Sequence, residues 1–224
     1  MSSLATSLPA TAVHPVDVRV EPALDGRNRL TTAFRLILAI PHLLIVGGPA
    51  ASVLWWSSGV TADGRPRDGL VGGVLSAVAA VVAFIAWFAI LFTGRFPEGL
   101  WTLVAFYMRW RVRASVYTTL LRDEYPPFGD GEYPAVLEIH RPDQPRNRLT
   151  VFFRLLLALP HLFVIWILGT AWAIVSMIAW FSILFTGRYP ASLYEFSVGV
   201  LRWTTRVEAY LLLLHDDYPP FSLS

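Results

Sequence analysis

Four long apolar runs dominate the pattern of hydrophobic and polar positions along the chain. The runs are Leu30–Trp56, Leu70–Thr93, Leu149–Leu168 and Ala171–Thr186. The only charges inside them are Arg35 and Arg154, each near the start of its run. A helix needs about 20 apolar residues to cross the hydrocarbon core of a bilayer. The pattern therefore predicts four membrane-spanning helices, the last two joined by a tight turn at Gly169 and Thr170.

An internal duplication organises the chain. Arg27–His42 and Arg146–His161 are identical at 12 of 16 positions, at an offset of 119 residues. Trp87–Pro97 and Trp180–Pro190 match at 9 of 11 positions, but at an offset of 93. The offsets differ by 26 residues, which is extra chain between the two apolar runs of the first copy. Each copy is therefore predicted to hold one helix hairpin with two spans.

A short alternating segment precedes the apolar part of each copy. Apolar side chains occupy every second position in residues 16–20 and again in residues 135–139, which is typical of half-buried strands that can pair with each other. The predicted organisation is a tail at 1–13, a first repeat at 14–128, a linker at 129–134 and a second repeat at 135–224.

A third, less apolar helix is predicted near the end of each repeat. Arg109 and Arg113 are four residues apart in the first copy, as are Arg202 and Arg206 in the second, so each pair shares one helix face. Arginines beside tryptophans suit an amphipathic helix lying among lipid headgroups. The predicted fold is therefore an all-α integral membrane bundle of four spans, with two interfacial helices, a short strand pair and these four arginines as lipid-headgroup ligands.

The distribution of arginines predicts the orientation of the spans. Eight arginines lie between the second and third runs, whereas the first external turn has only Arg65 and Arg67, offset by Asp63 and Asp68. By the positive-inside rule both termini are expected in the cytoplasm of a bacterial cell, with the chain crossing the inner membrane several times. The first 18 residues lack the basic and apolar regions of a signal peptide, so the internal runs are expected to drive insertion.

The sequence Leu-Ala-(Ile/Leu)-Pro-His marks one apolar run in each copy. It places Arg35 and His42, and likewise Arg154 and His161, two helical turns apart on one face. Polar groups inside a span are candidate functional sites. In one interpretation each arginine extends to the cytoplasmic interface, and each histidine binds a carbonyl freed by the neighbouring proline. In the other, the two histidines line a proton or ion path.

Two further motifs recur in both copies. Phe-Thr-Gly-Arg-aromatic-Pro is expected to end one helix at Gly94 or Gly187 and to start the next. Asp-acid-Tyr-Pro-Pro-Phe closes the copies at 123–128 and 216–221. Its proline pair favours an extended tail that either pins itself to the bundle or docks a partner.

The composition disfavours several classes of function. Only 15% of residues are charged, against roughly 25% in an ordinary soluble domain. The net charge of +2 disfavours a nucleic-acid surface, although all 18 basic residues are arginines, which suit phosphates. Cysteine is absent, and no P-loop, dinucleotide-binding or hydrolase motif occurs. We therefore expect no enzyme activity, no cofactor and no metal site.

The repeated RLLLALPH, WFSILFTGRYP, RWTTRVEAY and YPPF segments resemble a bacterial membrane-protein family known only as domain of unknown function 4389. The resemblance covers nearly the whole chain as two copies and implies an integral membrane protein without a known activity. The leading hypothesis is a non-enzymatic accessory or scaffold protein that binds anionic lipid and another membrane protein. The alternative is a small transporter or channel that uses the Pro-His kinks.

Overall fold

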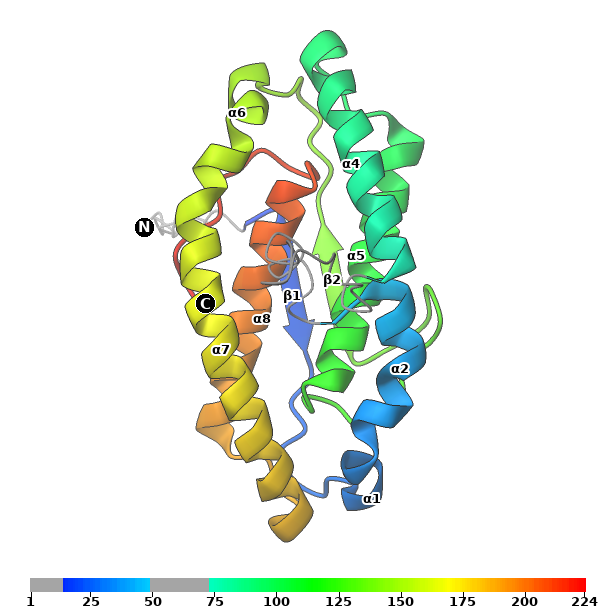
Figure 1. The fold of residues 1–224 in the computed structure, drawn as a ribbon, viewed down its shortest axis with the longest axis vertical. Helices are drawn as coiled ribbons and strands as arrows, with labels where there is room; N and C mark the ends of the chain where they lie inside the picture. The colour runs from blue at the N-terminus through cyan, green and yellow to red at the C-terminus, as the bar shows by residue number, and fades with distance from the viewer. Residues whose placement is uncertain (1–13, 49–72) are drawn as a thin grey trace, which may run out of the picture.

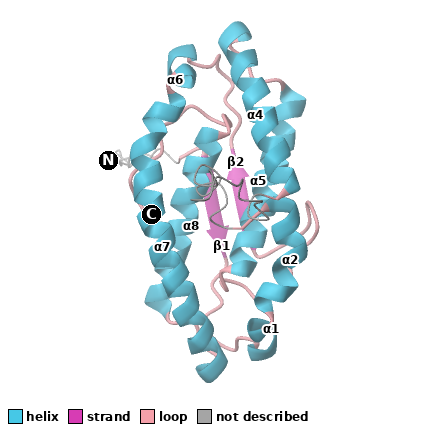
Figure 2. Cartoon of the chain, viewed as in Figure 1, coloured by secondary structure: helices cyan, strands magenta, loops and turns pink. Residues whose placement is uncertain are grey.

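The computed structural model of the chain describes residues 14–48 and 73–224, which form a mostly helical fold with one two-stranded sheet (Figure 2). The predictions for residues 1–13 and for the first external turn lie outside the described residues. The elements are β1 (Val16–Val20), α1 (Arg29–Ala33), α2 (Arg35–Val46), α4 (Val74–Thr93), α5 (Glu98–Thr118), β2 (Ala135–Ile139), α6 (Arg148–Phe152), α7 (Arg154–Thr186) and α8 (Ala191–Leu211).

The two strands pair antiparallel, one from each repeat, as the alternating pattern predicted. Val18 lies opposite Leu137, and both side chains are buried against the helices. The other face of the sheet is open, and there Arg19 forms an ion pair with Glu138. The strand pair therefore joins the two repeats at their centre, with one apolar and one charged face.

The second repeat contains one long helix where two were predicted. Helix α7 runs without interruption for 33 residues, so the predicted turn at Gly169 and Thr170 is wrong. A single glycine costs a helix only about 1 kcal/mol relative to alanine, and the Thr170 hydroxyl donates to the Trp166 carbonyl inside the helix. No proline or charge follows that would stop the apolar run.

The first repeat builds the counterpart of α7 from two pieces. A Cβ placed on Gly73, at the start of α4, would lie 2.3 Å from the backbone nitrogen of Gly47, at the end of α2. Helices α2 and α4 therefore meet end to end, and the extra chain of the first copy separates them in sequence. Among the described residues, only α4 and α7 are long and apolar enough to cross a membrane, so the four-span prediction is not confirmed.

The third helix of each repeat lies at the centre of the fold. Helix α7 packs on α8, α2 and α4 pack on α5, and the strands pack on the same two central helices (Figure 1). Most of α8 is buried, including Val200 and Ala209. This corrects the prediction of two interfacial helices, because the polar groups that made them look amphipathic are satisfied by other parts of the chain.

The long outer helices expose apolar side chains. In α7 the buried positions form one stripe that includes Arg154, Ala158 and His161, and the rest of the helix surface is open. Phe163 is 66% exposed and Phe185 is 76% exposed. Similar exposed residues on α2 and α4 are Leu36, Ile37, Leu44, Val81, Phe84, Ile85 and Phe92. We call the exposed apolar surface of α2, α4 and α7 the outer face.

Candidate functional site

Residues from different motifs of one repeat contact one another in the folded chain, and Arg35 is the first example. Its guanidinium is buried, forms an ion pair with Asp123 and lies 4.3 Å from the centre of the Tyr117 ring. Arg27 pairs with the same carboxylate at 2.8 Å. Burial alone would raise the pKa of Asp123, but hydrogen bonds from Arg27, from the backbone of Asn28 and from Arg35 outweigh it and hold this pKa below its ordinary value.

The second repeat contains the same cluster. Asp216 accepts ion pairs from Arg146 at 2.7 Å and from Arg154 at 2.6 Å, and Arg154 lies 4.3 Å from the centre of the Tyr210 ring. Neither Arg35 nor Arg154 extends to the surface, because each is held by the aspartate of the closing motif. Sequence reasoning missed these partners, although both aspartates occupy the same position in the repeat.

The two histidines of the Pro-His motif lie in aromatic clusters. Trp110 donates its indole N–H to Nδ1 of His42 at 3.0 Å, and Phe128 stacks on the imidazole with centroids 4.4 Å apart. Trp203 and Phe221 make the same contacts with His161, at 3.1 and 3.9 Å. The Tyr-Pro-Pro-Phe tail is therefore pinned to the bundle, one of its two predicted roles. Nδ1 accepts from tryptophan in both copies, whereas the sequence interpretation had each histidine binding a carbonyl freed by the neighbouring proline of its own helix.

The four arginines predicted to bind lipid headgroups have partners within the chain. Arg109 pairs with Asp130 at 3.3 Å. Arg113 donates to the carbonyl of Gly129. In the second repeat, Arg202 donates to Val18, whereas Arg206 is buried and donates to Val16 and Ser224. These side chains fasten the central helices to the linker, the first strand and the end of the chain.

A buried ion pair breaks the symmetry between the central helices. Arg111 on α5 pairs with Glu208 on α8, and the Tyr107 hydroxyl donates to the same carboxylate at 3.2 Å. Thr204 and Ser115 occupy the corresponding positions of the other repeat. The pair therefore specifies how α5 and α8 face each other, since neither charge has a counterpart in the other copy.

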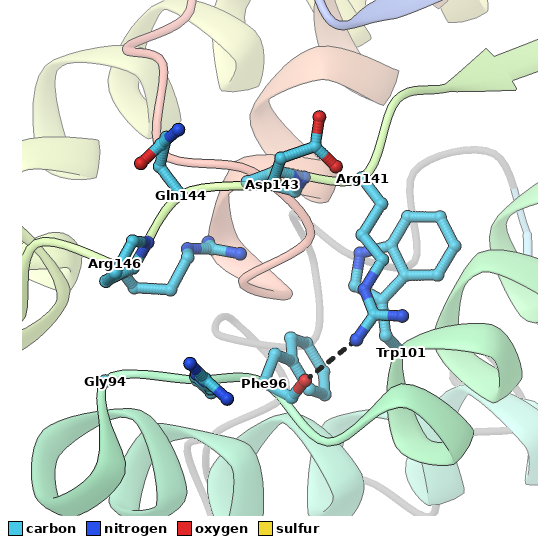
Figure 3. Close-up of a pocket in the computed structure, with 10 residues that line it drawn as sticks. Gly94, Phe96, Trp101, Arg141, Asp143, Gln144 and Arg146 are labelled. Atoms are coloured by element: carbon cyan, nitrogen blue, oxygen red, sulfur yellow. Dashed lines mark hydrogen bonds between the residues drawn. The ribbon is translucent and has the colours of Figure 1, made fainter.

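A pocket of about 300 Å³ opens at one end of the molecule, where α4 turns into α5. Its lining residues are Gly94, Arg95, Phe96, Trp101, Arg141, Pro142, Asp143, Gln144, Pro145 and Arg146. Figure 3 shows Arg141 beside Trp101 and Phe96, whereas the Asp143 carboxylate points away from them. Arg141 donates to the Phe96 carbonyl at 3.4 Å. The pocket is a concave, arginine-bearing surface that sequence reasoning did not find, since Arg95 and Arg141 are far apart in sequence.

The described residues contain no group of three or more histidine, aspartate or glutamate side chains that could hold a metal ion. The polar clusters of the two repeats are instead closed ion pairs and aromatic contacts. The end pocket, by contrast, offers exposed cationic groups in a concave setting.

Comparison with known proteins identifies one family. Residues 69–129 and 148–222 match the model of a domain of unknown function, DUF4389, which covers more than half of the chain. The two matched segments fall in the two repeats. No curated protein and no solved structure matches the chain.

Proposed function

Because the chain belongs to the DUF4389 family, whose function is unknown, we propose from its geometry that it is a non-enzymatic accessory or scaffold protein embedded in a membrane. The observation that carries the proposal is the outer face. Large apolar residues cover it, and residues 155–186 of α7 contain no acidic or basic side chain except His161. Exposed apolar patches of this extent mark membrane or protein contacts rather than a water-facing surface.

The energetics favour a lipid environment for the outer face. Burying one phenylalanine or leucine side chain contributes about 1.5–3 kcal/mol. The face exposes more than ten such residues at 40% or more of their surface, including Leu36, Phe84, Phe163 and Phe185. Their transfer from water would stabilise the embedded protein by an amount on the order of 10 kcal/mol or more. A peripheral contact through a few residues would not use most of this surface.

The proposal includes an orientation with the long helices lying along the bilayer plane. A helix of 33 residues is about 50 Å long, against about 30 Å of hydrocarbon. In Figure 1 the strand pair lies halfway along the long axis of the molecule. If that axis crossed the bilayer, the exposed pair of Arg19 and Glu138 would lie in hydrocarbon. In the in-plane orientation the outer face enters the lipid and the charged face of the sheet stays in water.

This orientation replaces the sequence-based scheme of four spans but keeps part of it. Arg206 donates to both Val16 and Ser224, so the two ends of the described chain lie close together beside the sheet. Both ends would then face the cytoplasmic side of a bacterial inner membrane. The charged sheet face and the linker between the repeats would be available to a membrane-protein partner.

Single-cysteine labelling distinguishes the two schemes, because the chain has no cysteine. Thr170→Cys lies at the middle of α7 and Glu132→Cys in the linker, and both positions are exposed. In intact cells an impermeant maleimide should label neither. In broken cells it should label only Glu132→Cys, and detergent should release labelling at Thr170→Cys. Labelling of Thr170→Cys from outside would restore the four-span scheme, and recovery of the protein in the soluble fraction would overturn membrane embedding altogether.

The scaffold role is tested by co-purification from the native host in mild detergent. We expect one membrane protein to elute with the chain in a fixed ratio, and a chain that elutes alone would contradict the scaffold role.

The alternative function, a small transporter or channel, rests on Pro41 and Pro160 inside the outer helices, each followed by a buried histidine. It predicts ion or solute flux in liposomes that His42→Ala and His161→Ala alter.

A further inference from the structure

The two ends of the molecule are related by the duplication but carry different charged residues. At the end with the pocket, residues 141–146 lie across the turn from α4 to α5, and the Arg146 amide donates to Gly94 at 2.9 Å. At the opposite end, residues 22–27 lie across the turn from α7 to α8, and the Arg27 amide donates to Gly187 at 3.0 Å. Each end is therefore an internal control for the other.

At the end without the pocket, the arginine has an acidic neighbour. Arg188, the counterpart of Arg95, pairs with Asp25 at 2.9 Å; both side chains are 75% exposed, so the pair is weak but places a negative charge beside Arg188. At the pocket end Gln144 stands at the position of Asp25, so Arg95 lacks this partner; the acids of that end are Asp143, in place of Leu24, and Glu98, in place of Ala191. Pro22 stands at the position of Arg141, so the second arginine is present only at the pocket end.

Two arginines at the pocket end remain available to a ligand. Arg95 is exposed and forms no ion pair with any described residue. The Arg141 side chain is 39% exposed, donates to the Phe96 carbonyl and contacts the Trp101 ring. It pairs at 3.4 Å with Glu98, whose side chain is 80% exposed to water. An ion pair this open contributes little, so an anion can replace the Glu98 carboxylate. Arg146 is different, because it is buried and its guanidinium is held by Asp216 and by the Leu213 carbonyl.

The pocket lies at the border of the outer face. Phe92 precedes it by two residues on α4 and is 78% exposed. Leu149 on α6 is 72% exposed, and the neighbouring Arg148 reaches to 3.7 Å from a Cβ placed on Gly94. Cationic groups therefore stand directly beside apolar side chains, which is the arrangement that meets a phosphate together with its acyl chains.

We propose that this pocket binds the phosphate of an anionic phospholipid, and that the opposite end does not. Arg95 and Arg141 donate to the phosphate oxygens, Trp101 borders the headgroup, and the acyl chains lie along Phe92 and Leu149. This inference rests on the proposed membrane embedding, because the border of the outer face must lie at the level of the headgroups.

Lipid binding by the purified protein tests the proposal. The detergent-solubilised chain is titrated with dioleoyl phosphatidylglycerol, with dioleoyl phosphatidylcholine and with inorganic phosphate, and bound lipid is counted by native mass spectrometry. We expect one molecule of phosphatidylglycerol bound in preference to phosphatidylcholine. Arg95→Gln and Arg141→Gln should each weaken it by about tenfold or more, since each removes a charge-assisted contact. Arg188→Gln, the matched change at the other end, should leave it unchanged.

Exchanging the residues that distinguish the ends sharpens the test. Gln144→Asp gives Arg95 the acidic partner that Arg188 has, and it should weaken phosphatidylglycerol binding without removing an arginine. Asp25→Gln with Pro22→Arg should add a second bound lipid. Equal binding in Arg95→Gln, Arg141→Gln and the wild type would overturn the proposal, as would saturation of the pocket by inorganic phosphate at the same concentrations.

A separate measurement keeps this proposal distinct from membrane embedding itself. All variants should float with vesicles of pure phosphatidylcholine, because the outer face is unchanged in each. Flotation without any preference for phosphatidylglycerol would refute the headgroup site alone. Failure to float would refute the embedding on which the site depends.

Discussion

The aspartate of the closing motif is expected to be the most sensitive charged position in the fold. Asp123→Asn keeps the size of the side chain but removes the negative charge that pairs with both Arg27 and Arg35. The side chains of Arg27 and Arg35 are each only 1% exposed, whereas that of Asp123 is 24% exposed. Removing one partner of a buried ion pair costs about 3–5 kcal/mol, because the remaining charge is left uncompensated. Since the carboxylate is partly open to water, we expect a loss of about 3 kcal/mol.

The duplication and the sheet supply controls for this prediction. Asp216→Asn removes the same contact from the second repeat and should cost a similar amount. Glu138→Gln breaks the pair with Arg19, in which the two side chains are 44% and 63% exposed, and should cost less than about 1 kcal/mol. The free energy of unfolding would be measured in mixed micelles, with dodecyl sulfate as denaturant and tryptophan fluorescence as the signal.

The pH dependence provides a second readout for Asp123. Its pKa is lowered in the folded protein, so its contribution to stability is present above the unfolded value of about 3.9 and is lost as the pH falls through the folded pKa. Below about pH 4 the wild type should therefore lose stability more steeply than Asp123→Asn. A cost for Asp123→Asn no larger than that for Glu138→Gln, or an unchanged acid profile, would refute the assignment of Asp123 as the anchor of both arginines.

Three further predictions follow from other contacts. The first replaces both members of the buried pair by the residues at the same positions of the other repeat, Arg111→Thr with Glu208→Ser. The double variant should be destabilised less than Glu208→Ser alone, which removes the carboxylate that pairs with Arg111. A double-mutant cycle in which the two losses of stability are additive would contradict this. Burial lowers the pKa of His215 to about 3. The wild type should therefore lose stability as the pH falls below about 6.5, by up to about 1.4 kcal/mol per pH unit. A His215→Phe variant whose melting temperature keeps the same dependence on pH would contradict this assignment. Gly94 ends α4 with φ +73°, so Gly94→Ala should cost about 1 kcal/mol, measurable as a lower melting temperature, and an unchanged value would argue against the left-handed cap.

The repeat pattern predicted the parts of the fold that depend on local periodicity. The strand pair followed from alternation at residues 16–20 and 135–139, and the helix ends at Gly94 and Gly187 followed from the glycine-arginine motif. The turn at Gly169 failed because apolar composition cannot distinguish one long helix from two short ones. The two apolar runs of the first copy suggested a hairpin, whereas α2 and α4 meet end to end.

The surroundings of the candidate site residues were likewise only partly predictable from the sequence. The fold holds the candidate residues, Arg35, His42, Arg154 and His161, in the same way in both copies, as their duplication suggested. Their partners, however, come from more than 60 residues away or from another helix. The arginine pairs of α5 and α8 looked amphipathic because the sequence does not reveal which backbone carbonyls will face them. The end pocket depends on a loop of the second repeat closing over a turn of the first.

The short helices also connect the two repeats in a crossed manner. Helix α1 of the first repeat packs on α7 of the second, where Trp180 donates to the Thr32 carbonyl. Helix α6 of the second repeat packs on α4 of the first, where Trp87 donates to the Val151 carbonyl. Each half of the chain thus completes the other, as subunits do in a domain-swapped dimer. The chain is arranged as such a dimer joined into one polypeptide, and we expect a chain holding one repeat alone to form a symmetric pair.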